Sequence, residues 1–115
     1  LQSADKIDVM EVERNALTDK RGLIPQIEPR YHYTYFSHIF NGGYSAGYYF
    51  YIWAEVLDKD AYALFKEKGI FDQETAQKFR TLLEKGGTED PMELYRTFRG
   101  AEPNPEAMLI GRGLK

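Results

Sequence analysis

The sequence predicts an all-α fold in a single domain. Two observations lead to this prediction: apolar residues recur at helical spacing along most of the chain, and residues typical of helix ends separate the segments. No stretch alternates apolar and polar residues over the length of a useful β-strand, and no internal repeat or low-complexity tract is evident. With 115 residues the chain is long enough for one modest hydrophobic core. We therefore expect residues 1–115 to form one helical unit.

The N-terminal third predicts two helices joined by an extended connector. The first helix should cover about residues 5–20, where apolar residues are spaced among charges, and should stop at Gly22. Prolines at positions 25 and 29 remove backbone donors and disfavour helix in the residues before them, so this stretch should be extended. A short helix over about 31–40 should then end at the sequence Asn-Gly-Gly, residues 41–43.

The longest helix is expected over about residues 44–68, with Gly69 as its C-terminal cap. Four residues follow an i, i+4, i+7, i+11 series and would share one narrow face of this helix: Tyr44, Tyr48, Tyr51 and Glu55. The other side carries an apolar set suited to packing against neighbouring helices: Tyr49, Ile52, Trp53, Val56 and Leu57. Glu55 is expected either to belong to the tyrosine face or simply to pair with Lys59 at i+4.

Three shorter helices are predicted in the C-terminal third from their caps. Asp72 should cap a helix over about 73–85, which Gly-Gly at 86–87 ends. Asp90 and Pro91 provide the cap and first residue of a helix that continues to about 99, before Gly100. The sequence Asn-Pro-Glu at 104–106 repeats this device for a last short helix through about 110.

Composition and charge exclude several classes of function. The formal net charge is −3 and the basic residues form no stripe, so nucleic acid is not expected as a partner. No cysteine is present, which excludes a disulfide scaffold and thiolate zinc sites. The sequence contains no run of about 18 apolar residues that would predict a membrane span, so we expect a soluble protein. Its compartment stays open between the cytoplasm and the periplasm. The start at Leu1 without a methionine suggests a piece of something larger.

Residues 30–55 are rich in polar aromatic side chains and predict a recognition surface. Seven of the nine tyrosines lie here, together with both histidines and the glycine pair. A buried phenol needs a hydrogen-bond partner, so a core built only for stability would use more aliphatic residues. A histidine, a glycine turn and three phenols could instead donate hydrogen bonds to a developing negative charge. An aromatic stripe of this kind is also typical of core packing, and the residues alone leave both interpretations open.

Four motifs in order carry a family resemblance: YFSHIFNGGYSAGYYFYIWAE, GIFDQETAQKFR, GGTEDPMELYRTFRG and the closing GRGLK. They resemble the C-terminal end of M3-family zinc oligopeptidases, most of all the peptidyl-dipeptidase (dipeptidyl carboxypeptidase) branch. The six-residue interval from His38 to Tyr44 favours that branch. The resemblance implies a helical array that forms the C-terminal part of a larger, mostly helical zincin-type peptidase domain.

The same resemblance implies a zinc site that this chain does not contain. In the family, a helix with the motif HExxH and a further glutamate hold the metal, and the motif's glutamate acts as base. Here only His32 and His38 are present, six residues apart and not framed as HExxH. We therefore expect zinc in the parent enzyme and no metal bound by this chain alone. His32 is expected to be an ordinary, partly exposed helix residue.

What remains resembles the part of the site that receives the substrate. Carried over by motif, His38, Tyr44 and Tyr51 are the implied catalytic residues, because in the family such groups hydrogen-bond the substrate and the tetrahedral intermediate. The implied substrate-binding residues are Tyr48, Gly42 and Gly43. Phenols fit this task because they donate to an oxyanion without carrying charge themselves.

The resemblance predicts a substrate-binding and oxyanion-stabilising segment of a zinc metallopeptidase that removes dipeptides from the C-terminus of short peptides. Its partners would be peptide substrates and the remainder of the parent chain, and the segment alone would be inactive. One alternative is a noncatalytic helical module that binds a peptide or protein through its tyrosines; another is a purely structural domain. A fragment should expose apolar and tyrosine surfaces, so we also expect self-association or marginal stability.

Overall fold

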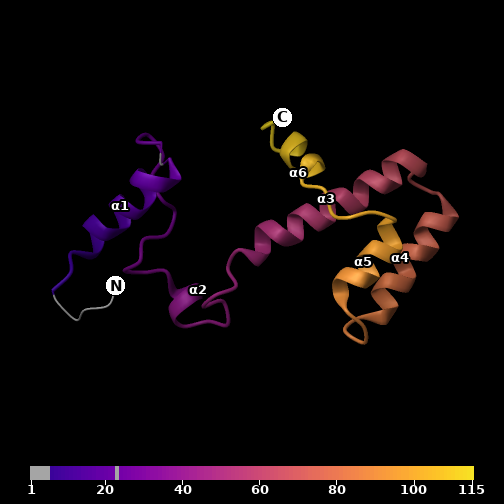
Figure 1. Cartoon of the computed structure of the whole chain (residues 1–115), viewed down its shortest axis with the longest axis horizontal. Coiled ribbons are helices and arrows are strands. Elements are labelled where there is room, and N and C mark those ends of the chain that lie inside the picture. The colour runs from indigo at the N-terminus through magenta and orange to yellow at the C-terminus, as the bar shows by residue number, and fades with distance from the viewer. Residues whose placement is uncertain (1–5, 23) are drawn as a thin grey trace. The chain divides into compact units, whose positions relative to one another are not determined.

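The computed structural model describes residues 6–22 and 24–115, and every regular element in that part of the chain is a helix. The all-α prediction is therefore confirmed. The chain divides into two compact units, of which the first ends at Tyr48 and the second covers Tyr49–Lys115. Figure 1 shows α1 and α2 in the first unit and α3 to α6 in the second.

The first unit begins with α1, Val9–Arg21. The Asp8 carboxylate caps this helix, since it accepts hydrogen bonds from the N–H groups of Met10 at 3.0 Å and Glu11 at 3.1 Å. Gly22 ends it in the left-handed conformation, with φ of 66°, as predicted. The helix starts about four residues later than predicted; residues 1–5 lie outside the described part.

A turn-rich segment and the short helix α2, Ser37–Phe40, complete the first unit. The prediction of a helix over 31–40 is wrong for residues 31–36, which are not helical: residues 33–35 form a turn, and the Tyr35 N–H donates to the His32 carbonyl at 3.1 Å. Aromatic residues have modest helix propensity, and nothing in this run caps a helix start. The predicted end is confirmed, because α2 stops at Asn41.

The second unit starts with α3, Phe50–Lys68, so the predicted helix over 44–68 is wrong in its first six residues. Residues 43–49 form turns, and the N–H of Gly47 donates to the carbonyl of Tyr44 at 3.1 Å. Glycine costs about 1 kcal/mol relative to alanine inside a helix, which opposes extending α3 backwards through Gly47. Tyr44 and Tyr48 therefore precede α3, and the expected four-residue face shared with Tyr51 and Glu55 does not form.

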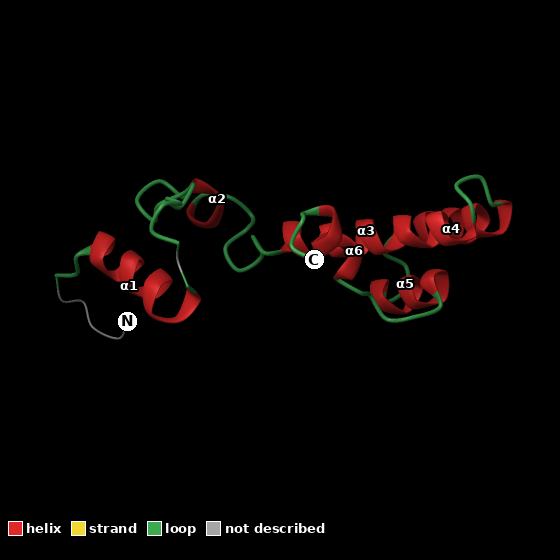
Figure 2. Cartoon of the chain, turned by 90° about the horizontal axis from the view of Figure 1, so that it is seen from above, coloured by secondary structure: helices red, strands yellow, loops and turns green. Residues whose placement is uncertain are grey.

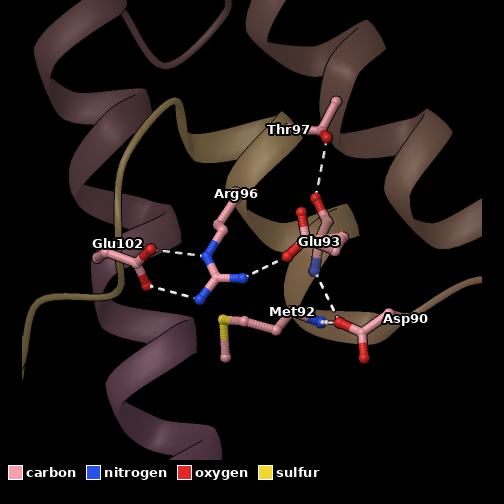
Figure 3. A network of polar contacts seen from close by, with 6 residues as sticks. All are labelled: Asp90, Met92, Glu93, Arg96, Thr97 and Glu102. Atoms are coloured by element: carbon pink, nitrogen blue, oxygen red, sulfur yellow. Dashed lines mark hydrogen bonds and ion pairs between the residues drawn. The ribbon is translucent and has the colours of Figure 1, made fainter.

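The remaining helices lie close to their predicted positions: α4, Gln73–Lys85; α5, Pro91–Arg99; and α6, Glu106–Gly111. The Asp72 carboxylate accepts from the N–H of Thr75 at 2.8 Å. The Asp90 carboxylate accepts from the N–H groups of Met92 and Glu93 at 2.9 and 3.0 Å (Figure 3). The Asn104 side chain accepts from the N–H of Glu106 at 2.9 Å. Side-chain capping thus fixes the starts of α4 and α5, and a turn closed by Asn104 precedes α6.

Helix α4 lies beside α5, and α6 packs on α3 (Figures 1 and 2). Four buried residues form the core of this unit: Ala61 and Leu64 from α3, with Tyr95 and Phe98 from α5. The apolar face expected on the first turns of α3 is only partly covered. Val56 is buried, but 56% of Ile52 and 43% of Trp53 remain exposed.

A buried carboxylate ties α3 to α5. Asp60 is 2% exposed and accepts hydrogen bonds from the Tyr95 hydroxyl at 2.8 Å and the Arg99 Nε at 3.2 Å. On the surface of α5, the Arg96 guanidinium pairs with Glu93 and with Glu102, the latter at 2.7 Å (Figure 3). Arg96 thereby fastens the segment that follows α5 to the helix.

Candidate functional site

The predicted site residues lie in both units. His38 belongs to α2, and Gly42, Gly43, Tyr44 and Tyr48 follow it in the turns that end the first unit. Tyr51 lies in the first turn of α3, in the second unit.

His38 sits among aromatic rings. Its imidazole centroid lies 5.2 Å from Tyr31, 5.8 Å from Phe36 and 5.5 Å from Tyr48. The Nδ1 atom is buried and has no hydrogen-bond partner among the described residues. A buried polar atom left unsatisfied costs about 1 to 3 kcal/mol, and such atoms are commonly satisfied by water or a bound group. Packing, rather than a hydrogen bond at Nδ1, therefore sets the orientation of this ring.

A hollow of about 210 Å³ opens beside this histidine, lined by Ser37, His38, Asn41, Gly42 and Tyr44. Gly42 comes close to α2: a Cβ at this position would lie 3.0 Å from the His38 carbonyl oxygen. That is tighter than ordinary van der Waals contact, so the backbone reaches this position because glycine has no side chain. At Gly43 a Cβ would meet open space.

Tyr44 and Tyr48 extend the aromatic cluster from His38. Their ring centroids are 6.3 Å apart in an edge-to-face arrangement, and Tyr48 also packs edge-to-face on Phe36 at 4.8 Å. Tyr48 is half-buried, whereas Tyr44 is exposed at the hollow. The structure thus brings three of the predicted residues, His38, Tyr44 and Tyr48, into one cluster.

Tyr51 is 57% exposed on α3, one turn before Glu55. The expected Glu55–Lys59 pair does not form, because Glu55 instead accepts from Arg112 Nε at 3.1 Å and Lys59 lies 3.5 Å from Asp58. The hydrogen bond from Arg112 is the main reason that the pKa of Glu55 is lowered. This ion pair joins the residue following α6 to the turn of α3 next to Tyr51.

One polar contact in the first unit was not predicted. Glu13 of α1 is only 5% exposed; it contacts His32 Nδ1 with one carboxylate oxygen and accepts from the Tyr33 N–H at 2.8 Å with the other. The hydrogen bond with His32, followed by that from Tyr33, lowers the pKa of Glu13. His32 is therefore held in a turn, not on the helix that was expected. The sequence carried a signal, since Glu13 lies on the apolar stripe of α1 between Met10 and Leu17.

The described residues do not form a metal site. Among them, no three histidine, cysteine, aspartate or glutamate side chains lie together in a way that could hold a metal ion. In residues 6–22 and 24–115, no helix has the length and apolar character needed to cross a membrane. Chemically, the arrangement offers a histidine and the Tyr44 phenol beside an open hollow, groups suited to hydrogen-bonding a polar ligand.

Comparison with known proteins matches residues 2–114 to Peptidase family M3. Oligopeptidase A of Salmonella typhimurium is 58% identical over 81 residues, covering 70% of this chain and 12% of that protein. Dipeptidyl carboxypeptidase of the same organism is 42% identical over 114 residues, 98% of this chain and 17% of that protein. Probable cytosolic oligopeptidase A of Arabidopsis thaliana is 43% identical over 111 residues, 92% of this chain and 16% of that protein.

The chain thus spans between 12 and 17% of the length of these relatives. The family match covers almost all of its residues, including both units and the cluster around His38. The chain belongs to peptidase family M3.

Proposed function

We propose that this chain is the substrate-binding and oxyanion-stabilising segment of a zinc metallopeptidase that acts on short peptides. The observation that supports this most is the hollow beside His38, lined by Gly42 and Tyr44, in a chain that belongs to a peptidase family. In this proposal the zinc ligands belong to other parts of the protein, and the segment alone is inactive. Peptide substrates and the rest of the peptidase are its partners, and its compartment is the cytoplasm or the periplasm.

Each residue has a role that fits its chemistry. His38 binds the peptide backbone of the substrate, and Gly42, Gly43 and Tyr44 form a loop that closes on it. Tyr51 donates its hydroxyl proton in a hydrogen bond to the oxyanion of the tetrahedral intermediate, and Tyr48 lines the substrate side. A phenol suits this role because its hydrogen bond is stronger to the charged oxyanion than to the neutral carbonyl of the ground state.

The experiment on the mechanism uses the full-length enzyme that contains this segment. Tyr51→Phe deletes one hydroxyl, and we expect a loss of transition-state stabilisation of about 2.7 to 4 kcal/mol, which is about 10²- to 10³-fold in kcat. Tyr62→Phe is the matched control, because Tyr62 is an exposed tyrosine on the same helix. Equal kcat in the wild-type and Tyr51→Phe enzymes would remove the proposed role of Tyr51.

We further propose that the enzyme releases dipeptides from the C-terminus of its substrates. The similarity to dipeptidyl carboxypeptidase over 98% of the chain supports this specificity. The 58% identity to oligopeptidase A supports a second candidate, internal cleavage of short peptides. A short peptide and its C-terminally amidated twin distinguish the two. If C-terminal dipeptides are released and amidation suppresses their release, the result supports dipeptide removal. If both peptides give the same internal products in equal amounts, the result supports internal cleavage.

The alternative of a noncatalytic helical module can be tested by sequencing the reading frame of the gene upstream of the Leu1 codon. A reading frame that encodes HExxH and a downstream glutamate before Leu1 supports the peptidase. An initiator methionine close to Leu1, without that motif, supports a module that binds a peptide or protein through its tyrosines.

A further inference from the structure

The Glu13 carboxylate is a buried charge with two donors from a different segment of the first unit. At 5% exposure it contacts the His32 imidazole and accepts from the Tyr33 N–H at 2.8 Å. Removing a carboxylate from water is costly unless hydrogen bonds replace the lost hydration, so these two bonds matter to the local structure. They fasten residues 32 and 33 to α1.

The segment fastened in this way also holds the candidate substrate-binding histidine. Tyr31, the residue before His32, packs edge-to-face on Phe36 at 5.0 Å and on His38 at 5.2 Å. Phe36 lies 5.8 Å from His38. Because His38 Nδ1 has no hydrogen-bond partner among the described residues, these rings and Tyr48 determine where the imidazole points.

From these contacts we infer that Glu13 is a positioning residue for His38: through His32 and Tyr33 it fixes the aromatic segment that orients the histidine toward the hollow. Glu13 itself does not line that hollow. The inference deepens the proposed function and rests on it, since it requires His38 to bind substrate.

A displaced His38 should weaken substrate binding. A misplacement of about 1 Å caused by a change far from the chemistry can cost about 100-fold in rate. For Glu13→Gln we expect a fall in kcat/KM of about 10- to 100-fold. Because His38 is assigned to the substrate backbone in both ground and transition states, the fall should appear mainly as a raised KM, with kcat nearly kept.

The test is a double-mutant cycle in the full-length enzyme, with Glu13→Gln, His38→Ala and both together. If Glu13 acts through His38, the double variant has the kcat/KM of His38→Ala alone. Glu11→Gln is the matched control: it removes the same charge from an exposed position on the same helix and should leave KM unchanged. Thermal unfolding of each variant shows that the enzyme is folded at the assay temperature.

The outcomes separate this inference from the proposed function. The inference would be overturned if the losses in kcat/KM of Glu13→Gln and His38→Ala multiplied in the double variant. It would also be overturned if Glu13→Gln left KM unchanged while His38→Ala impaired the enzyme. An unchanged His38→Ala enzyme would overturn the proposed role of His38 and the inference with it. If Glu13→Gln does not fold, His32→Ala takes its place in the cycle, because it keeps the bond between Glu13 and the Tyr33 N–H.

Discussion

Asp60 carries a buried carboxylate that links two helices of the second unit. Its carboxylate is 2% exposed and depends on the Tyr95 hydroxyl and the Arg99 guanidinium for its hydrogen bonds. Burial, and then the hydrogen bond to Asp60, raises the pKa of Tyr95, so the phenol remains a donor to the carboxylate at ordinary pH. A buried charge of this kind is tolerated only while its partners stay in place.

Removing the phenol of Tyr95 should therefore destabilise the chain. We expect Tyr95→Phe to lower the free energy of unfolding by about 1 to 3 kcal/mol, because the buried Asp60 loses one of its two donors. Urea denaturation of wild-type and variant chains measures the difference. Tyr62→Phe, at an exposed site on α3, should change it by less than about 0.5 kcal/mol. Equal losses in the two variants would contradict the importance of the buried network.

The Glu55–Arg112 pair predicts a pH dependence of stability. The pKa of Glu55 is lowered from its usual 4.5, mainly by the hydrogen bond from Arg112. A lowered pKa in the folded state stabilises the chain above the unfolded value, and this contribution is lost as pH falls through the folded value. The difference in unfolding free energy between wild type and Arg112→Gln should thus be constant above about pH 6 and shrink below about pH 4.5.

Denaturation curves recorded across this pH range provide the measurement. Arg80→Gln is the control, since Arg80 pairs with Glu84 at an exposed position on α4. Its difference from wild type should be small at every pH. A wild-type advantage over Arg112→Gln that grows as pH falls would show that the sign is wrong.

Helix ends explain which elements could be predicted. The starts of α4 and α5 are where they were expected, because Asp72 and Asp90 bond to N–H groups only two or three residues ahead. The start of α3 was misplaced, because the helical periodicity continues through residues 43–49 even though Gly47 opposes a helix there. Local chemistry thus fixes a capped boundary, whereas an uncapped boundary depends on packing that periodicity does not describe.

The cap of α5 can be tested directly. Asp90→Ala removes the acceptor for the Met92 and Glu93 N–H groups, and we expect a loss of about 0.5 to 2 kcal/mol in unfolding free energy. Asp90→Asn keeps an acceptor and should be nearly neutral. Thermal or urea denaturation measures both. An equal loss in the two variants would show that charge near the helix start matters more than capping.

The candidate site shows the same limit of prediction. The short distance along the chain between His38 and Tyr44 made their proximity predictable, and the structure places both at one hollow. The contact between Glu13 and His32 joins residues 19 apart in the sequence. No local pattern specifies that partner; only the unusual position of an acid on an apolar stripe indicated that Glu13 needed one.

For the whole molecule, the important feature is apolar surface left uncovered at the start of α3. Tyr49, Phe50 and Ile52 are each more than half exposed, and the chain spans at most 17% of the relatives compared. Exposed apolar patches of several hundred Å² commonly mark contact surfaces. A fragment was expected to expose tyrosines and apolar residues; Tyr44, Tyr49 and Tyr51 are exposed here, whereas Tyr48 is half-buried.

This surface predicts self-association of the isolated chain. Sedimentation velocity over a range of concentrations should show a sedimentation coefficient that rises with concentration. Ile52→Glu places a charge in the exposed region and should reduce the association, whereas Ile70→Glu adds the same charge in the loop after α3 and should not. A wild-type chain that stays monomeric and unfolds cooperatively would contradict this prediction.

The close approach of Gly42 to the His38 carbonyl limits how this chain could be engineered for heat resistance. Replacing glycine with alanine often stabilises a protein by restricting its unfolded chain, provided that the native backbone accepts a methyl group. At Gly43 there is space for a methyl group. At Gly42 there is not, because the methyl group of an alanine would press on the His38 carbonyl. Of these two adjacent glycines, only the second is open to such a replacement.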